Sequence, residues 1–286
     1  MLPVARNVFQ PLNRQPVDET RTLVSSAPVV LLAGVIAIAV LGLNAWLVWP
    51  QIRFRWLFEP LGANAQGFSE YRHRQTGIVM VKLPGGKVWI GGQRADPNGQ
   101  NYDPHAGDHE TVCEVTVAPF LIGKYEVTRA QWRPFGKDLP PPREGDNRTP
   151  AVLVPGYRVT VNPWTDTPGF SERTGLSLPS EAQWVYASRG GSLRVPEEPP
   201  GWFAENSEGK LHRIGETAPN GFGLDDMFGN VQEWCIRDLE GETCTFVRLG
   251  GSWITPRRTA VVKSELYDPA IGDDDLGFRP AYYPLP

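Results

Sequence analysis

The hydrophobic pattern separates one long apolar segment from a mixed remainder. Residues 28–49, PVVLLAGVIAIAVLGLNAWLVW, lie inside a gap between charged residues that extends from Arg21 to Arg53. A segment of this length can cross a bilayer as a helix, and its apolar residues on every face are not those of an amphipathic surface helix. We therefore predict a transmembrane helix over residues 28–50, preceded by an N-terminal tail of residues 1–27.

The flanks of this segment favour an uncleaved anchor. Trp46, Trp49 and Trp56 gather at its C-terminal end, and tryptophan prefers the membrane–water interface. A cleaved signal peptide is the alternative, because residues 63–65 have a small-x-small form, but the apolar stretch is too long and that site too distant. Arginines on the two sides nearly balance, and we expect the domain to lie on the non-cytoplasmic side of the membrane.

The remaining chain predicts a juxtamembrane linker over residues 51–75 and one domain over residues 76–286. Apolar runs on both sides of Pro84-Gly85-Gly86 predict a β-hairpin within residues 77–92. Residues 112–128 supply two further short strands with alternating apolar positions. From Ser192 onward the chain is rich in turns, so the predicted fold class is α+β with much irregular chain.

Two short helices have recognisable starts. Thr128 with Gln131, and Ser180 with Gln183, match the capping box, in which a hydroxyl and an amide satisfy free backbone N–H groups. Gly190 is suited to end the second helix.

Composition and charge narrow the class of partner. The 30 glycines and 28 prolines indicate a loop-rich fold, and 10 tryptophans supply material for a core. The net charge is −4, of which residues 1–50 carry +1, so residues 51–286 carry −5. An acidic body argues against nucleic acid as the partner.

The three cysteines do not form a disulfide framework or a zinc motif. Cys235 and Cys244 flank a turn-like segment and could bridge in an oxidising compartment. Free buried thiols are the other interpretation, and we favour it for these two.

Two segments carry residues that bind metals in other contexts. His105 and His109 stand four residues apart, but the surrounding proline and glycine oppose the helix that would align them. The second segment is Asp273-Asp274-Asp275, whose adjacent carboxylates are more typical of a hydrated turn than of a calcium site.

Several motifs resemble those of the formylglycine-generating enzyme family, also called the sulfatase-modifying factor family. In chain order these are LIGKYEVTRAQW at 121–132, LPSEAQW at 178–184, PNGFGLDDMFGNVQEW at 219–234, GGSW at 250–253 and GFR at 277–279. They cover nearly all of residues 76–286. The resemblance implies the family's compact variant of the C-type-lectin-like fold.

The resemblance also implies a structural calcium ion. Its ligands would be the carboxylates of Asp226 and Glu233 and the backbone carbonyls of Gly229 and Val231. Such hard oxygen donors around a glycine-containing turn suit Ca²⁺.

Catalytic members of the family place two copper-binding cysteines after Gly-Gly-Ser, where this chain has Thr255 and Ala260. Copper(I) needs soft thiolates, which a hydroxyl and a methyl group do not replace. The resemblance therefore implies that formylglycine generation is lost and that copper and iron are not cofactors.

These observations lead to a principal hypothesis and two alternatives. The first is a single-pass, non-catalytic domain that binds a protein partner, as a recognition module or as an accessory subunit of a membrane complex. Its recognition surface would comprise Arg257, Arg258, Lys263 and Tyr267. The second is a metal-dependent oxidoreductase with a divergent site that uses the histidines or the acidic turn, and the third is a purely structural domain.

Overall fold

The computed structural model describes residues 49–99, 101–102, 112–136, 147–160, 169–192, 196, 198–237, 245–259 and 265–283. No helix among these residues is long and apolar enough to cross a bilayer. Residues 28–48, which carry the transmembrane prediction, lie outside this set, and the anchor stays a prediction.

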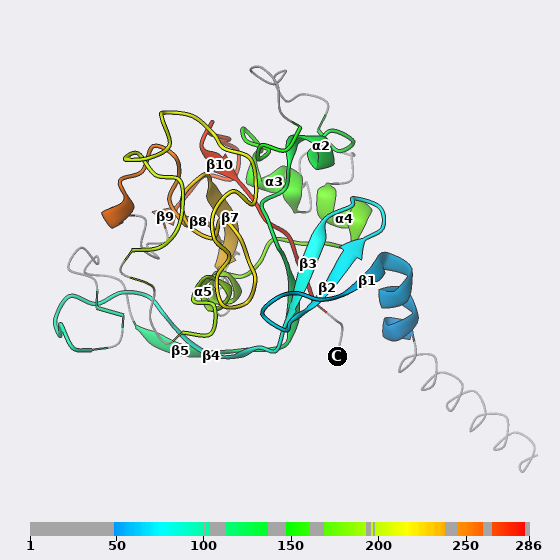
Figure 1. Cartoon of the computed structure of the whole chain (residues 1–286), viewed down its shortest axis with the longest axis horizontal. Helices are drawn as coiled ribbons and strands as arrows, with labels where there is room; N and C mark the ends of the chain where they lie inside the picture. The colour runs from blue at the N-terminus through cyan, green and yellow to red at the C-terminus, as the bar shows by residue number, and fades with distance from the viewer. Residues whose placement is uncertain are drawn as a thin grey trace, which may run out of the picture. The chain divides into compact units, whose positions relative to one another are not determined.

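The main sheet is antiparallel and has the order β1-β2-β3-β6-β11 (Figure 1). Its strands are β1 (Phe58–Ala63), β2 (Ser69–His73), β3 (Val79–Leu83), β6 (Phe120–Gly123) and β11 (Ala281–Tyr282). The last strand comes from the C-terminal end of the chain, so the sheet joins both ends of the domain.

A second sheet has the order β10-β7-β8-β9, in which β10 runs parallel to β7 and the other pairs are antiparallel. Its strands are β7 (Gln232–Arg237), β8 (Thr245–Leu249), β9 (Glu265–Leu266) and β10 (Leu276–Gly277). The third sheet contains β4 (Gly86–Ile90) and β5 (Cys113–Val117). The α+β class is confirmed.

The predicted hairpin within residues 77–92 is wrong, because β3 and β4 do not pair with each other. Instead β3 pairs with β6 and β4 pairs with β5. Leu83 lies opposite Phe120, and Gly86 lies opposite Val117, which is the same antiparallel register on both sides of the interruption. The four strands therefore form one bent ribbon that passes from the main sheet into the two-stranded sheet.

The bend in this ribbon depends on glycine at position 85. Its φ is +73°, and a Cβ atom there would collide with the backbone of the opposite strand at Val117 and Ala118. Only glycine adopts this conformation at so close an approach without strain. The Pro-Gly-Gly motif therefore does change the direction of the chain, but it bends a pair of strands and does not close a hairpin.

The helices are short, and both predicted capping boxes are present. They are α2 (Arg129–Trp132), α3 (Gly156–Val159), α4 (Phe170–Thr174), α5 (Glu181–Ser188) and the 3₁₀ helix η1 (Arg257–Thr259). Thr128 caps α2 and Ser180 caps α5, each with its partner glutamine. Gly190 has a φ of +59°, so the predicted stop after α5 is confirmed with the left-handed residue just beyond the helix.

The predicted linker over residues 51–75 belongs to the domain, and the predicted boundary at residue 76 moves towards the N-terminus. Residues 49–57 are helical, and the two strands that follow pair with β3. The compact unit begins at Pro50. Alternation in these strands was weak because β1 is largely exposed, so no hydrophobic pattern marked it.

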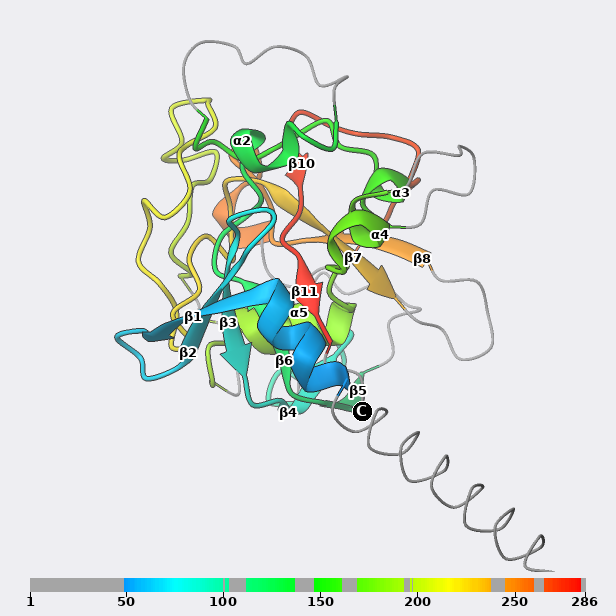
Figure 2. The same ribbon diagram turned by 90° about the vertical axis from the view of Figure 1, so that its right-hand side faces the viewer.

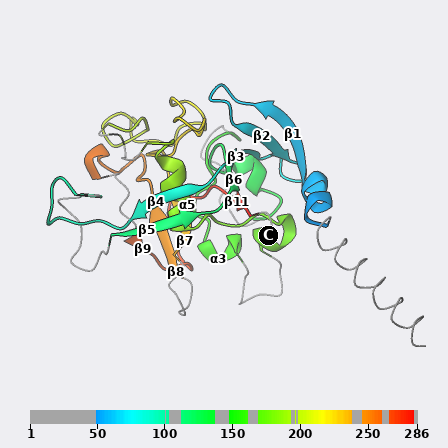
Figure 3. The same ribbon diagram turned by 90° about the horizontal axis from the view of Figure 1, so that it is seen from below.

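Two hydrophobic clusters lie on either side of this framework. One contains Trp184 of α5 together with residues from strands of all three sheets. Figure 3 shows α5 between the two-stranded β4–β5 sheet and β7. The other gathers Trp132, Phe170 and Phe278, with ring centroids 5.4 to 5.9 Å apart. Together they fix the loops that follow β6 and precede β7, where the candidate site lies.

His73, at the end of β2, is fully buried between the main sheet and α4. Its Nε2 lies 3.1 Å from the carbonyl oxygen of Thr174, and its Nδ1 lies 2.9 Å from the hydroxyl of Thr76. Nε2 therefore donates and Nδ1 accepts, which is the neutral imidazole. Burial lowers the pKa of His73 to about 4.

This burial predicts an acid-dependent loss of stability. A histidine whose pKa is lower in the folded state stabilises the fold above the unfolded pKa near 6.5 and loses that contribution as the pH falls towards 4. Between pH 7.5 and 4.5, the free energy of unfolding should fall by about 2 to 3 kcal/mol more in the wild type than in His73→Gln. Urea titrations at the two pH values measure this. The control Thr76→Val keeps the imidazole of His73, so its free energy of unfolding should fall with pH about as much as that of the wild type. Equal falls in the wild type and His73→Gln would contradict the prediction.

Candidate functional site

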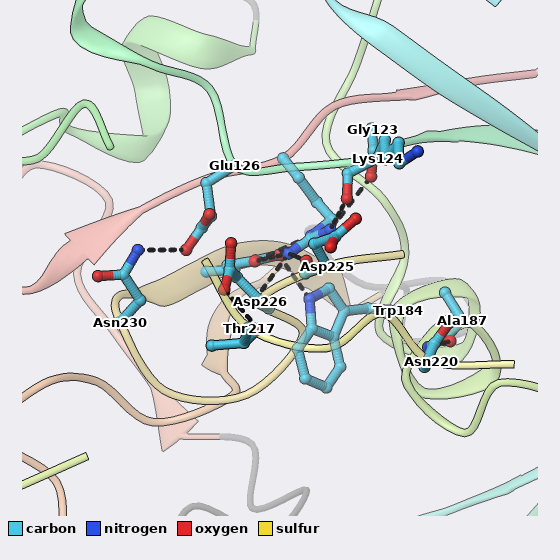
Figure 4. A network of polar contacts seen from close by, with 12 residues as sticks. Gly123, Lys124, Glu126, Trp184, Ala187, Thr217, Asn220, Asp225, Asp226 and Asn230 are labelled. Carbon is cyan, nitrogen blue, oxygen red and sulfur yellow. Dashed lines mark hydrogen bonds and ion pairs between the residues drawn. The ribbon is translucent and has the colours of Figure 1, made fainter. Parts of the chain in front are cut away.

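Arg279 lies at the centre of a buried polar network that connects four parts of the chain. Its guanidinium is fully buried and forms an ion pair with Glu233 of β7, with N–O distances of 2.6 to 2.8 Å. The other donors reach the backbone carbonyls of Gly123 and Lys124 after β6, and those of Asp225 and Asp226. Figure 4 shows how these segments converge.

Glu233 extends the network to α5. Its Oε2 accepts a hydrogen bond of 2.7 Å from Nε1 of Trp184, whose ring is fully buried. A buried ion pair needs additional hydrogen bonds to offset the cost of desolvation, and here both members have them. The pair therefore fixes the spacing between α5, β7 and the loop that carries Asp225.

Three further carboxyl groups surround the ion pair. Glu126, Asp225 and Asp226 are all buried, and Figure 4 shows them approaching one another from two segments of the chain. Within the described part of the chain, Glu126 Oε2 and Asp225 Oδ2 have no hydrogen-bond partner. Ionised together, these carboxylates exceed the positive charge that Arg279 supplies, so the cluster favours a bound proton or cation.

The pKa values follow from this excess of acid. Burial, and secondarily the charge of Asp226, raise the pKa of Glu126 well above its ordinary value. The same two causes raise the pKa of Asp225 to about 6. Burial also raises the pKa of Asp226, although hydrogen bonds from Gly215 N at 2.5 Å and Thr217 Oγ1 at 2.7 Å oppose the shift.

Left-handed backbone conformations shape the loop between Asp226 and Glu233. Asp226, Gly229 and Asn230 have φ values of +53°, +72° and +56°, and a Cβ atom at Gly229 would collide with the backbone of Trp202. The Asn230 side chain reaches back and donates to Glu126 Oε1 at 3.1 Å. The sequence GNVQE thus forms a compact turn that holds its polar groups towards the network.

The four predicted calcium ligands are located on this turn and on β7. Their donor set of carboxylates and carbonyls has the chemistry that Ca²⁺ prefers. Asp226 accepts two protein hydrogen bonds, which leaves lone-pair positions of its carboxylate for a cation. Glu233 accepts four contacts from Arg279 and Trp184, which is about the number of lone-pair positions that a carboxylate offers. No group of three or more histidine, cysteine, aspartate or glutamate side chains suited to a metal occurs among the described residues, so calcium stays a prediction.

A cavity of about 20 Å³ adjoins Asp226. This volume holds roughly one water molecule and is far smaller than a substrate pocket. Its lining residues include Asn220, Leu224 and Met227. The cavity has room for a water molecule beside Asp226 but cannot admit an organic substrate.

The Gly-Gly-Ser loop is closed by hydrogen bonds of its own side chains. Thr255 Oγ1 accepts from the backbone N–H of Ser252 at 3.0 Å and lies 3.0 Å from Ser252 Oγ. Ser252 Oγ donates to Asp275 Oδ2 at 2.6 Å, so the Thr255 hydroxyl is the donor in its contact with Ser252. The hydroxyl of Thr255 is therefore turned inward and used in the loop, while Ile254 beside it is 51% exposed.

Three of the four predicted recognition residues lie among the described residues, and their surroundings differ. Arg257 is half-buried, with its guanidinium 5.0 Å above the ring of Phe203 and its backbone N–H bonded to Glu205, whereas Arg258 is exposed. Tyr267 packs on Trp234 and donates to Asp273, so its described contacts are structural. Lys263 lies outside the described residues.

The candidate metal ligands His105 and His109 lie outside the described residues, as do Ala260 and Cys244. The acidic triplet is split, because Asp273 contacts Arg248 and Tyr267 while Asp275 bonds to Ser252 and Gln232.

Cys235 is a free buried thiol, as expected. Cys113 is free and exposed at the start of β5, a strand that has a solvent-facing side.

The most central side chains of the site were not singled out from the sequence. Arg279 and Glu126 belong to recognisable motifs, but nothing in a linear pattern showed that both lie in one buried cluster. The Trp202–His212 stack, with ring centroids 3.7 Å apart, also joins segments without a sequence signal. The available signal was a charged residue inside an apolar motif, such as the arginine of LGFRPA at residues 276–281. A charge that is buried with its apolar neighbours needs a partner of opposite charge.

The short helices, the three small sheets and the buried Arg–Glu network beneath a glycine-rich turn define an α+β fold of the formylglycine-generating-enzyme type. The chain belongs to the sulfatase-modifying factor enzyme 1-like domain family, whose profile matches residues 65–283.

Relatives of this chain include proteins described as inactive and others described as enzymes. The inactive C-alpha-formylglycine-generating enzyme 2 of Mus musculus is 27% identical over 269 residues, covering 70% of this chain and 84% of the relative. The formylglycine-generating enzyme of Mycobacterium tuberculosis is 36% identical over 134 residues, covering 40% of this chain and 41% of the relative.

A solved structure supports the same fold. Treponema denticola variable protein 1 superposes with a TM-score of 0.55 at 18% identity, covering 79% of this chain and 99% of that protein.

The buried ion pair predicts a large effect on stability. Arg279→Met removes the charge partner of Glu233, which keeps its hydrogen bond from Trp184, and removes the guanidinium donors to four backbone carbonyls. It should therefore lower the free energy of unfolding by about 3 to 5 kcal/mol. Lys87→Ala removes an exposed ion pair with Glu114 and should cost less than about 1 kcal/mol. Denaturant titration followed by tryptophan fluorescence compares the two. Adding Glu233→Gln to Arg279→Met should recover part of the loss, and similar stabilities for Arg279→Met and Lys87→Ala would refute this role.

Proposed function

We propose that this chain is a membrane-anchored, non-catalytic member of its family that binds a protein partner, as a recognition module or an accessory subunit of a membrane complex. The anchor is the apolar segment of residues 28–50, with the domain on the non-cytoplasmic side. Partner binding uses the surface around the Gly-Gly-Ser loop.

The hydroxyl of Thr255 is the observation that carries this proposal. In the resemblance to catalytic members, Thr255 stands where the first copper-binding cysteine would be. Its oxygen already bonds Ser252 within the loop, and a hydroxyl is a poor ligand for copper(I). The relative whose name describes it as inactive supports the same conclusion, since a fold does not by itself carry an activity.

The exposed part of the loop offers a surface for a partner. Ile254 is 51% exposed and Arg258 is exposed, an apolar and a cationic side chain four residues apart. Apolar contacts with an adjacent arginine are characteristic of protein interfaces. We assign the partner contact to this pair, with Arg257 at its edge.

Calcium has a structural function in this proposal. Asp226, Glu233 and the carbonyls of Gly229 and Val231 would hold the ion, and its charge would offset the excess of carboxylates around Arg279. This function is independent of any reaction, so it is compatible with a silent domain.

Metal content tests the non-catalytic assignment. The purified full chain should contain about one calcium ion without stoichiometric copper or iron, and it should consume no oxygen with copper(I) and a cysteine-containing peptide. Asp226→Ala should lose the calcium and Asp273→Asn should keep it, as measured by elemental analysis. Stoichiometric copper or iron together with oxygen consumption would establish the oxidoreductase alternative instead.

Site-specific photo-crosslinking in native membranes tests the partner surface. A photoreactive side chain at Arg258 should give one discrete adduct with a second protein, and the same side chain at Lys87, exposed on β4, should not. Ile254→Asp should remove the adduct from position 258 because it places a charge in an apolar contact. Absence of a discrete adduct at 258, or the same adduct at both positions, would count against this surface.

A further inference from the structure

The helix over residues 49–57 has two apolar faces, of which only one packs on the domain. Phe54 and Leu57 are partly buried against the second hydrophobic cluster. Ile52 and Trp56, one helical turn apart, are 41% and 79% exposed. Trp49 belongs to the same exposed stripe by helical periodicity and is 62% exposed.

Aromatic contacts fix the rotation of this helix about its axis. The ring of Phe54 lies 5.1 Å from Tyr71 of β2 and 6.0 Å from Tyr282 of β11, and Phe58 lies 4.9 Å from Tyr282. Figure 2 shows the helix in blue beside the main sheet. Since Phe54 is held from two strands, Ile52 and Trp56 cannot turn inward without breaking these contacts.

The charges beside the exposed stripe differ from those of the domain. Arg53 and Arg55 are exposed on the same helix, whereas residues 51–286 as a whole carry a net charge of −5. Tryptophan, isoleucine and arginine together are the side chains that bind the interface of an anionic bilayer, where apolar rings enter the headgroup region and guanidinium groups meet phosphates.

Chain connectivity identifies the membrane that could cover the stripe. The apolar segment of residues 28–49 directly precedes Ile52 and Trp56 in the chain, so the stripe is tethered within a few residues of the proposed bilayer surface.

We propose that the helix over residues 49–57 is an interfacial membrane-binding element, with Ile52 and Trp56 inserted among the headgroups of the bilayer that holds the anchor. The inference rests on the anchor in the proposed function and adds a second contact to it. Because the opposite face of the helix is fixed to the main sheet, this contact holds the whole domain in one orientation on the membrane.

Depth-dependent fluorescence quenching tests this inference in the full chain. The protein, with Cys113→Ser and Cys244→Ser, is reconstituted into nanodiscs of phosphatidylcholine and phosphatidylglycerol and labelled at Trp56→Cys. Lipids that carry a quencher at headgroup depth should cause a marked loss of fluorescence. The control is Leu266→Cys on β9, which is 65% exposed in the wild type and lies away from the helix (Figures 1 and 3); its label should lose far less.

Ile52→Asp provides the matched perturbation. It should reduce quenching at position 56 while the chain still co-floats with the nanodiscs and unfolds at the same temperature. Equal quenching at positions 56 and 266, or no quenching at 56 in a chain that co-floats, would overturn the inference. If the label at position 56 is quenched neither by iodide in the water nor by the quencher lipids, a neighbouring protein and not the bilayer covers the stripe, and the inference is overturned. A chain that fails to co-float would refute the anchor itself, and the inference with it.

Discussion

The ion pair between Arg279 and Glu233 is the constraint on which the rest of the structure depends. Neither charge is exposed to solvent, so each requires the other, and their remaining hydrogen bonds determine where the surrounding segments lie. The C-terminal strand, β7, α5 and the end of β6 meet there although they are distant in sequence. In a domain with such short helices and strands, this polar centre supplies the specificity of arrangement that long packed elements supply elsewhere.

Local structure was predictable where the sequence carries a local cause. The capping boxes at Thr128 and Ser180 and the stop at Gly190 depend on residues within one helical turn, and all three are present. The pairing of the two strands around Pro84-Gly85-Gly86 was not predictable, because both find their partners within residues 112–123 and not in each other. Alternation identifies a strand but does not name its neighbour.

The site shows the same division between local chemistry and long-range assembly. Motif resemblance located the turn that carries Asp226 and Glu233, and the family assignment supports the resemblance as a whole. It could not reveal that Arg279 binds Glu233, since 46 residues separate them. Nor could it reveal that Thr255 directs its hydroxyl to Ser252, because a threonine in a loop is equally compatible with exposure.

The bent ribbon of β3, β4, β5 and β6 has a consequence for changes in chain length. Both halves share one register, so adding a residue at the bend in one strand alone would shift one half relative to the other. Such a shift exchanges the buried and exposed faces of every residue beyond it. A change of length between Ile90 and Cys113, the last pair of β4 and β5, leaves that register unchanged. Natural insertions and engineered tags should therefore be tolerated in that connection and rejected at Gly85.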